Sequence, residues 1–339
     1  MNNIYDFDIT ELESIVNNLG YKPYRASQIF SGLYKGHDLE EITVLPQELK
    51  LQLKEKYILT PIAIYKEYKA KDGTIKYLLQ LNDDNLIECV FIKNNYGNTL
   101  CVSTQVGCGM GCAFCASGEG GLKRNLSAGE IAAQVICAAK ASGGIKNIVL
   151  MGSGEPLSNF DNTVKFLKLI SCKQGKNLSL RNISLSTCGI VPQIYNFTKL
   201  NLPVTLSLSL HSAFDEVRQK IMPIAKKYTV KQTIEAVKYY FEMSGRRIII
   251  EYTMIKDFNI SKKDADKLKE VLSGLNCHIN LIMLSPVENS EFLPCSKEQA
   301  EAFKDMLQKN MLSVTMRRQT GVDIEGSCGQ LKKKHILLC

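Results

Sequence analysis

The chain has 339 residues, 45% of them apolar, which suffices for one large domain with a smaller accessory part. The net charge of +8 is mildly basic, so it is compatible with nucleic-acid binding without requiring it. No apolar run is long enough to cross a bilayer, and the first residues lack the basic and apolar regions of a secretory signal. These features exclude a membrane-spanning protein of the helical kind, and we expect a cytosolic location.

The first part of the chain, residues 1–58, has the spacing of a small helical module. Apolar residues recur with helical period over 9–20, 24–36 and 45–57, and the first of these segments ends on Gly20. We therefore predict a helical accessory domain, for which RNA binding is the expected role.

Residues 59–98 change to a strand period. Apolar and polar residues alternate around the turn sequences "KDG" and "NDDN", which is typical of antiparallel hairpins. This segment is predicted to be a β-hairpin linker or extension between the helical module and the rest of the chain.

From 99 to 320, short β-rich runs alternate with helix-length amphipathic segments. The six candidate strands are "LCVSTQ", "NIVLMG", "NISLST", "VTLSLSL", "IIIEYTMI" and "HINLIML". Six β/α units predict an α/β fold with a parallel sheet, and function in β/α barrels gathers at the C-terminal strand ends. We predict that residues 321–339 form a C-terminal loop and tail.

The loop after the first strand holds Cys108, Cys112 and Cys115 in the spacing C-x-x-x-C-x-x-C. In a reducing compartment such clustering indicates metal binding or catalysis rather than disulfides. Three thiolates on a glycine-bearing loop can hold three irons of a cubane cluster and leave the fourth iron open to a ligand. A zinc site completed by Cys101 is the alternative, although only Cys112 and Cys115 form the close pair that such sites use.

The three-cysteine motif, with Phe114 before its last cysteine, resembles that of the radical S-adenosylmethionine (SAM) superfamily. Nearly the whole chain resembles the RlmN/Cfr family of radical SAM RNA adenine methyltransferases. The segments that carry this resemblance are "TLCVSTQVGC", "MGSGEPLSN", "STCGIVP", "SLSLHS" and "VDIEGSCGQL". The resemblance implies a partial (β/α)6 TIM-type barrel, a 4Fe–4S cluster held by the three cysteines, and SAM, which is used twice in each turnover.

The resemblance also implies a set of SAM contacts at successive strand ends. Taken singly, a "GEP" sequence is usually a turn, and a lone histidine is more often a structural hydrogen-bonding residue than a ligand. The implied SAM-binding residues are Gly154, Glu155, Ser186, Ser209, Leu210, His211 and Ser285. The family usually has Asn where this chain has Ser285, and Met where it has Ser153, so these two positions depart from its pattern.

Three further residues receive chemical roles from the resemblance. Cys328 accepts a methyl group as a thiolate, the S-methyl carbon is joined to RNA, and Cys101 releases the product through a transient disulfide with Cys328. Glu88 is the implied acceptor of the proton that leaves the adenine ring. Without the resemblance, Cys101 would be read as a small buried side chain and Glu88 as an exposed strand residue.

The implied product is 2-methyladenosine in 23S ribosomal RNA, with transfer RNA open as a second substrate and a flavodoxin- or ferredoxin-type protein as electron donor. Pro156 favours methylation at C2, because the relatives that methylate C8 have Ala there. A C8-methyltransferase, a radical SAM activase and a non-enzymatic metal-dependent RNA-binding protein remain alternatives. Basic pairs that could face phosphates, or equally form solvated surface, are Lys123-Arg124, Arg246-Arg247, Arg317-Arg318 and the run 332–334.

Overall fold

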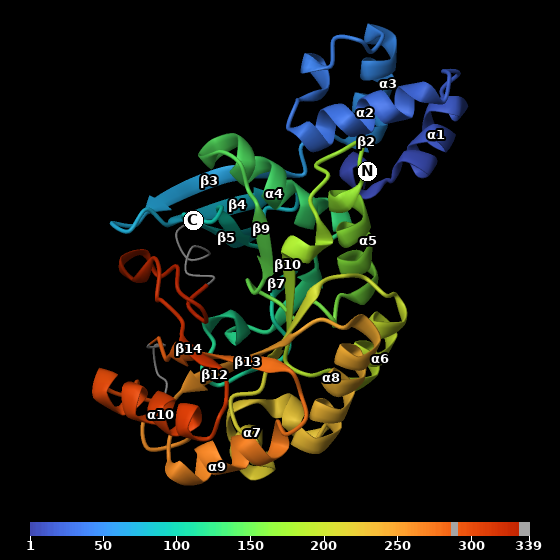
Figure 1. Ribbon diagram of the computed structural model, residues 1–339. Coiled ribbons are helices and arrows are strands. Elements are labelled where there is room, and N and C mark those ends of the chain that lie inside the picture. Colours follow the sequence, from blue (N-terminus) through green and yellow to red (C-terminus); the bar gives the residue numbers. More distant parts are fainter. Residues whose placement is uncertain (286–290, 332–339) are drawn as a thin grey trace.

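The computed structural model describes residues 1–285 and 291–331, and its N-terminal helices stand apart from a larger curved sheet (Figure 1). The three predicted helices are confirmed as α1 (Ile9–Asn18), α2 (Tyr24–Lys35) and α3 (Gln47–Lys56). Asp8 and Glu11 form a capping box that starts α1, and Gly36 ends α2 in the left-handed conformation. The short strands β1 (Asn2–Asn3) and β2 (Tyr57–Ile58) pair in parallel and bring the two ends of this module together.

The main sheet has ten strands in the order β14-β13-β12-β11-β10-β9-β6-β5-β4-β3. The six predicted β/α strands all lie in it and run parallel: β6 (Thr99–Cys101), β9 (Asn147–Leu150), β10 (Ile183–Thr187), β11 (Thr205–Ser209), β12 (Ile248–Met254) and β13 (Cys277–Met283). Because the strand order has two ends, the sheet is an open, partial barrel. The predicted α/β fold is confirmed.

Three antiparallel strands extend this sheet on one side. They are β3 (Ile62–Lys69), β4 (Ile75–Leu81) and β5 (Leu86–Ile92), and β5 pairs antiparallel with β6. On the other side, β14 (Val314–Met316) adds a parallel strand that the sequence pattern did not predict. Three residues are too few to show a strand period, so only its pairing with β13 reveals it.

Helices cover the outer side of the curved sheet (Figure 1). They are α4 (Ala128–Ser142), α5 (Phe160–Ser171), α6 (Val191–Lys199), α7 (Asp215–Ile221), α8 (Val230–Ser244), α9 (Lys262–Val271) and α10 (Lys297–Lys309). One continuous core packs the helices of the N-terminal module and of the barrel against these strands. Within the described residues, no helix is long and apolar enough to span a membrane.

Candidate active site

The loop with the three motif cysteines projects from the barrel, and its two ends lie side by side. Strands β7 (Gln105–Gly107) and β8 (Leu122–Asn125) pair antiparallel at its base, and the 3-10 turn Ala116–Gly118 follows Cys115. The backbone N–H of Cys115 donates to the carbonyl of Cys112 at 3.1 Å, which curls the loop so that Cys108, Cys112 and Cys115 all line one cavity.

Burial raises the pKa of all three thiols, that of Cys108 to about 11, and each thiol lies close enough to another for their charges to add to the effect. Such thiols bind protons tightly unless a cation stabilises their charge. Among the described residues, no three His, Cys, Asp or Glu side chains converge on one metal-ion position. The three cysteines that line one cavity are a donor set that fits a multi-iron cluster, in which each cysteine binds a different iron.

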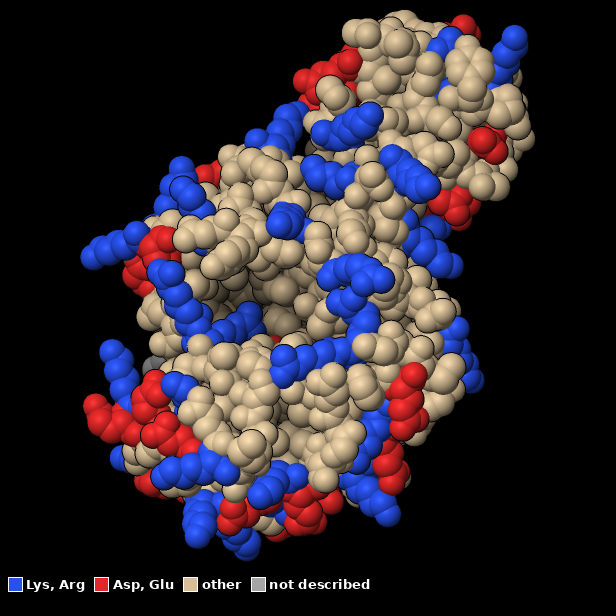
Figure 2. Space-filling model, viewed as in Figure 1, with Lys and Arg blue, Asp and Glu red and all other residues tan. Residues whose placement is uncertain are grey.

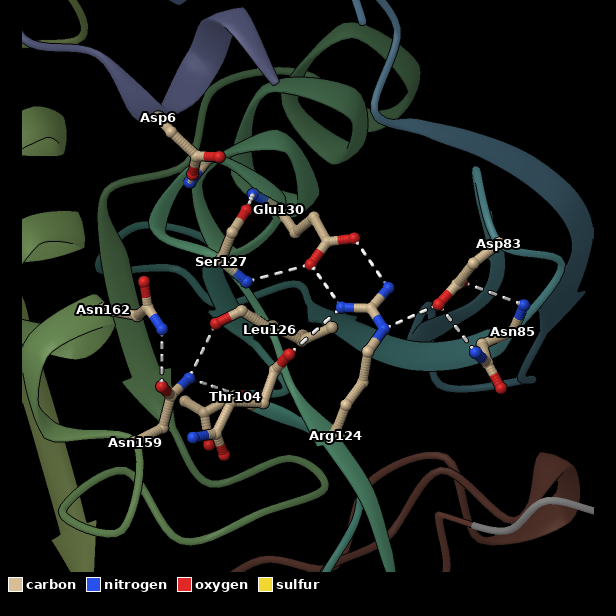
Figure 3. A network of polar contacts seen from close by, with 12 residues as sticks. Asp6, Asp83, Asn85, Thr104, Arg124, Leu126, Ser127, Glu130, Asn159 and Asn162 are labelled. Carbon is tan, nitrogen blue, oxygen red and sulfur yellow. Dashed lines mark hydrogen bonds and ion pairs between the residues drawn. The ribbon is translucent and has the colours of Figure 1, made fainter. Parts of the chain in front are cut away.

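The root of this loop is held by a polar network centred on Arg124 (Figure 3). Its guanidinium donates to Asp83 at 2.6 Å and to both carboxylate oxygens of Glu130 at 2.8 Å. Glu130 also caps helix α4 with Ser127. Arg124 therefore links β8 to helix α4 and to the turn between β4 and β5, so its charge is already paired with two carboxylates.

Asn159 completes the network on the other side of the loop (Figure 3). Its amide donates to the carbonyls of Thr104 and Leu126 at 2.9 and 2.8 Å, which ties together the two arms that lead into and out of the cysteine loop. Asp6, from the N-terminal module, accepts from the backbone of Gly129 at 2.6 Å. The accessory module thus contacts the start of the helix that follows the loop.

The cysteine cavity lies at the C-terminal ends of the parallel strands, as expected for a β/α barrel. Of the predicted SAM-binding residues, those that line it are Gly154, Glu155, Ser186, Ser209, His211 and Ser285. Ser186 and Ser209, from neighbouring strands, lie 3.3 Å apart through their hydroxyl groups. Leu210 differs, because its side chain is fully buried in the hydrophobic core rather than facing the cavity.

Glu155 is fixed by backbone hydrogen bonds. One carboxylate oxygen accepts from the N–H of Leu157 at 3.0 Å, and the other accepts from the N–H of Cys188 at 2.8 Å. Burial raises the pKa of this carboxyl, and the two N–H donors oppose that rise. A carboxylate at the cavity wall suits a ligand ammonium group such as that of SAM.

Gly154 shapes the cavity wall beside Glu155. Its φ of +108° is a left-handed conformation that favours glycine, and a Cβ here would lie 2.8 Å from the backbone nitrogen of Gln105. The chain can therefore pass close to the cysteine loop only because this residue has no side chain.

His211 is buried at the edge of the same cavity. Its Nδ1 accepts from the N–H of Thr253 at 2.9 Å, and its ring packs edge-on against Phe114. Burial and the nearby Arg218 lower its pKa to about 3. The imidazole is therefore neutral with its proton on Nε2, which makes that atom a hydrogen-bond donor.

Cys328 and Cys101, which are far apart in sequence, line a second cavity that adjoins the first. Cys328 lines both cavities. Cys101 is buried, and its pKa is raised to about 12 by burial and by the charge of Cys328, while Arg317 lowers it. The structure therefore brings together the thiols that the resemblance assigned to one reaction. Both are free cysteines, and no disulfide joins the cysteines of the described ranges.

The loop with Cys328 is attached to the cysteine loop by hydrogen bonds. The backbone of Ala116 donates to the carbonyl of Gly329 at 2.8 Å, and the Ser117 hydroxyl donates to the carbonyl of Leu331 at 3.1 Å. Residues 332–339, with the basic run predicted there, lie outside the described residues, as does Pro286 after the sixth strand.

Glu88 is buried on β5 and is paired with Lys76 on β4 at 3.1 Å. Without the family resemblance, the sequence alone would have placed Glu88 on an exposed part of a strand. Glu88 does not itself line either cavity. Its neighbours Val90 and Ile92, two and four residues further along the strand, do line the second cavity, so Glu88 faces the same side of the sheet.

Two residues of the site were not predicted from the sequence. Glu251 on β12 lines the first cavity, and one of its buried oxygens has no hydrogen-bond partner among the described residues. Arg317, just after β14, lies 3.5 Å from that carboxylate and lines both cavities. Glu251 carries a weak sequence signal, as a charge inside an otherwise apolar strand. Arg317 stands out in the sequence only as part of a basic pair.

On the face shown in Figure 2, Lys and Arg side chains surround a hollow in the barrel. Arg318 is exposed and lines the second cavity. The other basic pairs are partly used within the fold: Arg246 donates to the Thr205 hydroxyl at 2.6 Å and Arg247 to the carbonyl of Cys277 at 3.0 Å. Positive charge around the opening of a cavity favours binding of a polyanion that inserts one of its groups into that cavity.

Comparisons with known proteins agree with this site. A family model described as "Radical SAM superfamily" matches residues 102–268, and one described as "Ribosomal RNA large subunit methyltransferase N-terminal domain" matches residues 2–59. A probable dual-specificity RNA methyltransferase RlmN from Clostridium acetobutylicum is 44% identical over 339 residues, 99% of this chain and 98% of that protein. One from Alkaliphilus oremlandii is 46% identical, covering 97% and 96%.

The fold has a close counterpart among solved structures. The crystal structure of a radical SAM methyltransferase from Sphaerobacter thermophilus superposes with a TM-score of 0.95 at 38% identity, covering 98% of this chain and 99% of that one. The full-length similarity and both family matches agree with the cysteine loop and the barrel described above. The chain belongs to the RlmN family of the radical SAM superfamily.

Proposed function

We propose that this protein is a dual-specificity RNA methyltransferase that places a methyl group on C2 of adenine in 23S ribosomal RNA and in transfer RNA. The observation that supports this most is the position of Cys328, which lines both the cavity of the motif cysteines and the cavity of Cys101. A methyl-carrying thiol needs this placement, because it must reach SAM first and a second thiol later.

Membership of the radical SAM family implies an iron–sulfur cluster and SAM. In this proposal Cys108, Cys112 and Cys115 hold a 4Fe–4S cluster, and Gly154, Glu155, Ser186, Ser209, His211 and Ser285 surround SAM. When bound, these groups supply the methyl group, the hydrogen-abstracting radical and the single-electron transfers. The Glu155 and Glu251 carboxylates both line this cavity and suit the hydrogen-bond donors of such a ligand. Electrons come from a flavodoxin- or ferredoxin-type protein.

Cys328 acts first, as the thiolate that accepts the methyl group by displacement. Its loop is exposed enough for RNA to reach it, yet it is anchored to the cysteine loop through Gly329. Arg317 lines both cavities beside Cys328, so a positive charge lies close to the methyl-accepting thiol. The methyl carbon then becomes bonded to C2 of adenine, and the RNA is covalently attached to Cys328.

Glu88 and Cys101 resolve this adduct. Glu88 takes the proton from C2, and the Cys101 thiolate attacks the sulfur of Cys328. The sulfur–carbon bond breaks, its electron pair leaves with the carbon, and that carbon takes a proton to become the methyl group. Cys101 and Cys328 are left as a transient disulfide, which a thiol reductant returns to two thiols.

The same proposal assigns roles along the chain. Residues 1–58 form an RNA-binding accessory domain, 59–98 an extension of the sheet, 99–320 the radical SAM barrel and 321–339 the loop and tail that carry the methyl-accepting cysteine. The basic rim around the hollow supports RNA as the ligand (Figure 2).

The experiment is nucleoside mass analysis of 23S ribosomal RNA and transfer RNA from cells with and without this protein. We expect 2-methyladenosine in both RNAs only when the protein is present. A product that is 8-methyladenosine alone would assign the C8 reaction instead, and no new methyladenosine in either RNA would refute the proposal.

A further inference from the structure

Lys76 on β4 is a buried cation with no role in the proposed methyl transfer. Its side chain is 6% exposed and its Nζ lies 3.1 Å from the Glu88 carboxylate, whose side chain is 5% exposed. A buried lysine is rare without a charged partner, and a buried carboxylate left alone would take up a proton. The two residues are therefore a mutually neutralising pair inside the sheet.

The pair faces the reaction cavities rather than the outer helices. In the sheet register, Lys76 lies directly opposite Val90, and Leu78 lies opposite Glu88. Opposed residues of an antiparallel pair share a face, and Val90 lines the cavity that contains Cys101 and Cys328. Lys76 and Glu88 therefore stand diagonally to each other on the cavity side.

Lys76 makes a second contact, to the loop that carries Cys328. Its Nζ lies 3.4 Å from the carbonyl oxygen of Glu325, three residues before that cysteine. The hairpin end beside it makes two more contacts to the same loop: Asp72 accepts from the backbone of Gly321 at 3.0 Å, and the backbone of Lys71 donates to Asp323 at 3.2 Å. One side chain thus connects the carboxylate of Glu88 to the methyl-carrying loop.

We propose that Lys76 is a positioning residue that keeps Glu88 ionised and aligned with the loop of Cys328. The inference rests on the proposed function, in which Glu88 takes the C2 proton. A base must be ionised before it can accept a proton, and burial favours the neutral acid. A cation at 3.1 Å opposes this, so the carboxylate remains available at neutral pH.

Other charged or titratable groups lie around the pair. On β3, the Tyr68 ring packs 5.1 Å from the Lys76 ammonium. On β5, Cys89 is buried and its pKa is raised, in part by the charge of Glu88. Cys101 on β6 is buried as a thiol, and the loop contributes the acidic residues Asp323 and Glu325. One further cation lies nearby, because Lys66 on β3 is 4.9 Å from the same Tyr68 ring, but Lys66 is exposed whereas Lys76 is buried against Glu88 at 3.1 Å.

The test compares Lys76→Met, Lys76→Arg and Glu88→Gln with the unchanged protein, and Lys69→Met serves as the matched control. Lys69 is an exposed lysine on the adjacent strand, paired with Glu67 at 3.6 Å. Three quantities are measured: S-methylation of the Cys328 peptide, the fraction of protein covalently bound to RNA, and the rate of adduct resolution between pH 6 and 9.

Lys76→Met should keep S-methylation of Cys328, which needs no base, but should resolve the adduct at least about tenfold more slowly at pH 7. Because loss of the Lys76 cation favours the neutral acid at low pH and the carboxyl ionises as pH rises, the deficit should shrink toward pH 9. Lys76→Arg should restore most of the rate, Glu88→Gln should stay slow at every pH, and Lys69→Met should match the unchanged protein.

The inference is overturned if Lys76→Met resolves the adduct at the normal rate and with the normal pH dependence. It is also overturned if Lys76→Met loses S-methylation together with resolution, since Lys76 would then only hold the loop. If the unchanged protein forms no 2-methyladenosine and Glu88→Gln forms no adduct, the proposed function itself fails. This result differs from both outcomes for Lys76→Met, because it concerns the unchanged protein.

Discussion

The backbone of Ala116 donates a hydrogen bond of 2.8 Å to the carbonyl of Gly329. This bond joins the residue after the last motif cysteine to the residue after Cys328, although more than two hundred positions separate them in the chain. The cluster-binding loop and the methyl-accepting loop are therefore fixed to each other, and substitutions in either loop are expected to have distinct chemical consequences.

The three motif cysteines should each be required for iron. Replacing Cys108, Cys112 or Cys115 with Ala removes one thiolate from the cavity, and we expect anaerobically purified protein to lose its iron and sulfide. Cys172→Ala, a half-buried cysteine at the end of α5, should keep both. Stoichiometric zinc without iron in the unchanged protein would contradict the cluster assignment.

Substitutions of the two cysteines in the second cavity should block the reaction at different steps. Cys328→Ala removes the methyl carrier, so neither product nor RNA adduct should form. Cys101→Ala removes only the resolving thiol, so a protein–RNA adduct stable to denaturant should accumulate, and the double substitution should lose it. Peptide mass analysis after ribonuclease treatment should place the remnant nucleotide on Cys328. Normal turnover by Cys101→Ala, or a remnant on another residue, would rule out the thiol-exchange mechanism.

Gly154→Ala should damage both the fold and SAM binding. A Cβ would lie 2.8 Å from the backbone of Gln105 at a φ of +108°, and we expect a loss of about 1–3 kcal/mol in the free energy of unfolding. Denaturant unfolding and equilibrium dialysis of SAM measure the two effects. Gly144→Ala is the control, because nothing lies within 4 Å of a Cβ at that position. Equal stability and SAM affinity in both variants would show that the cavity wall tolerates a side chain.

His211 should make stability depend on acid pH. Burial and Arg218 lower its pKa to about 3, so the unfolded chain binds a proton at higher pH than the folded chain does. Its contribution is therefore fully present above the unfolded value of about 6.5 and is lost as pH falls from there toward 3. His211→Gln should flatten the decline in unfolding free energy between pH 7 and 4.5, by at most about 1.4 kcal/mol per pH unit. Denaturant titrations with iron content monitored at each pH measure this, and parallel curves would refute it.

Much of the architecture could be predicted from the sequence because its signals are local. Helical period, with Gly20 at the end of the first segment, predicted the N-terminal helices, and six short apolar runs predicted the parallel strands. The spacing of Cys108, Cys112 and Cys115 predicted a shared site for the same reason: three thiols within eight residues must share one loop wherever that loop lies.

Only the tertiary structure decided which distant residues meet. Lys76 reaches Glu88 through the register of two antiparallel strands, and Arg317 reaches Glu251 because β14 pairs with β13 and β13 with β12. Neither pairing has a signal in the local sequence, since strand register depends on side chains of the whole sheet. The same holds for the side chain of Leu210, whose burial in the core between the cavity-lining residues Ser209 and His211 only the structure shows.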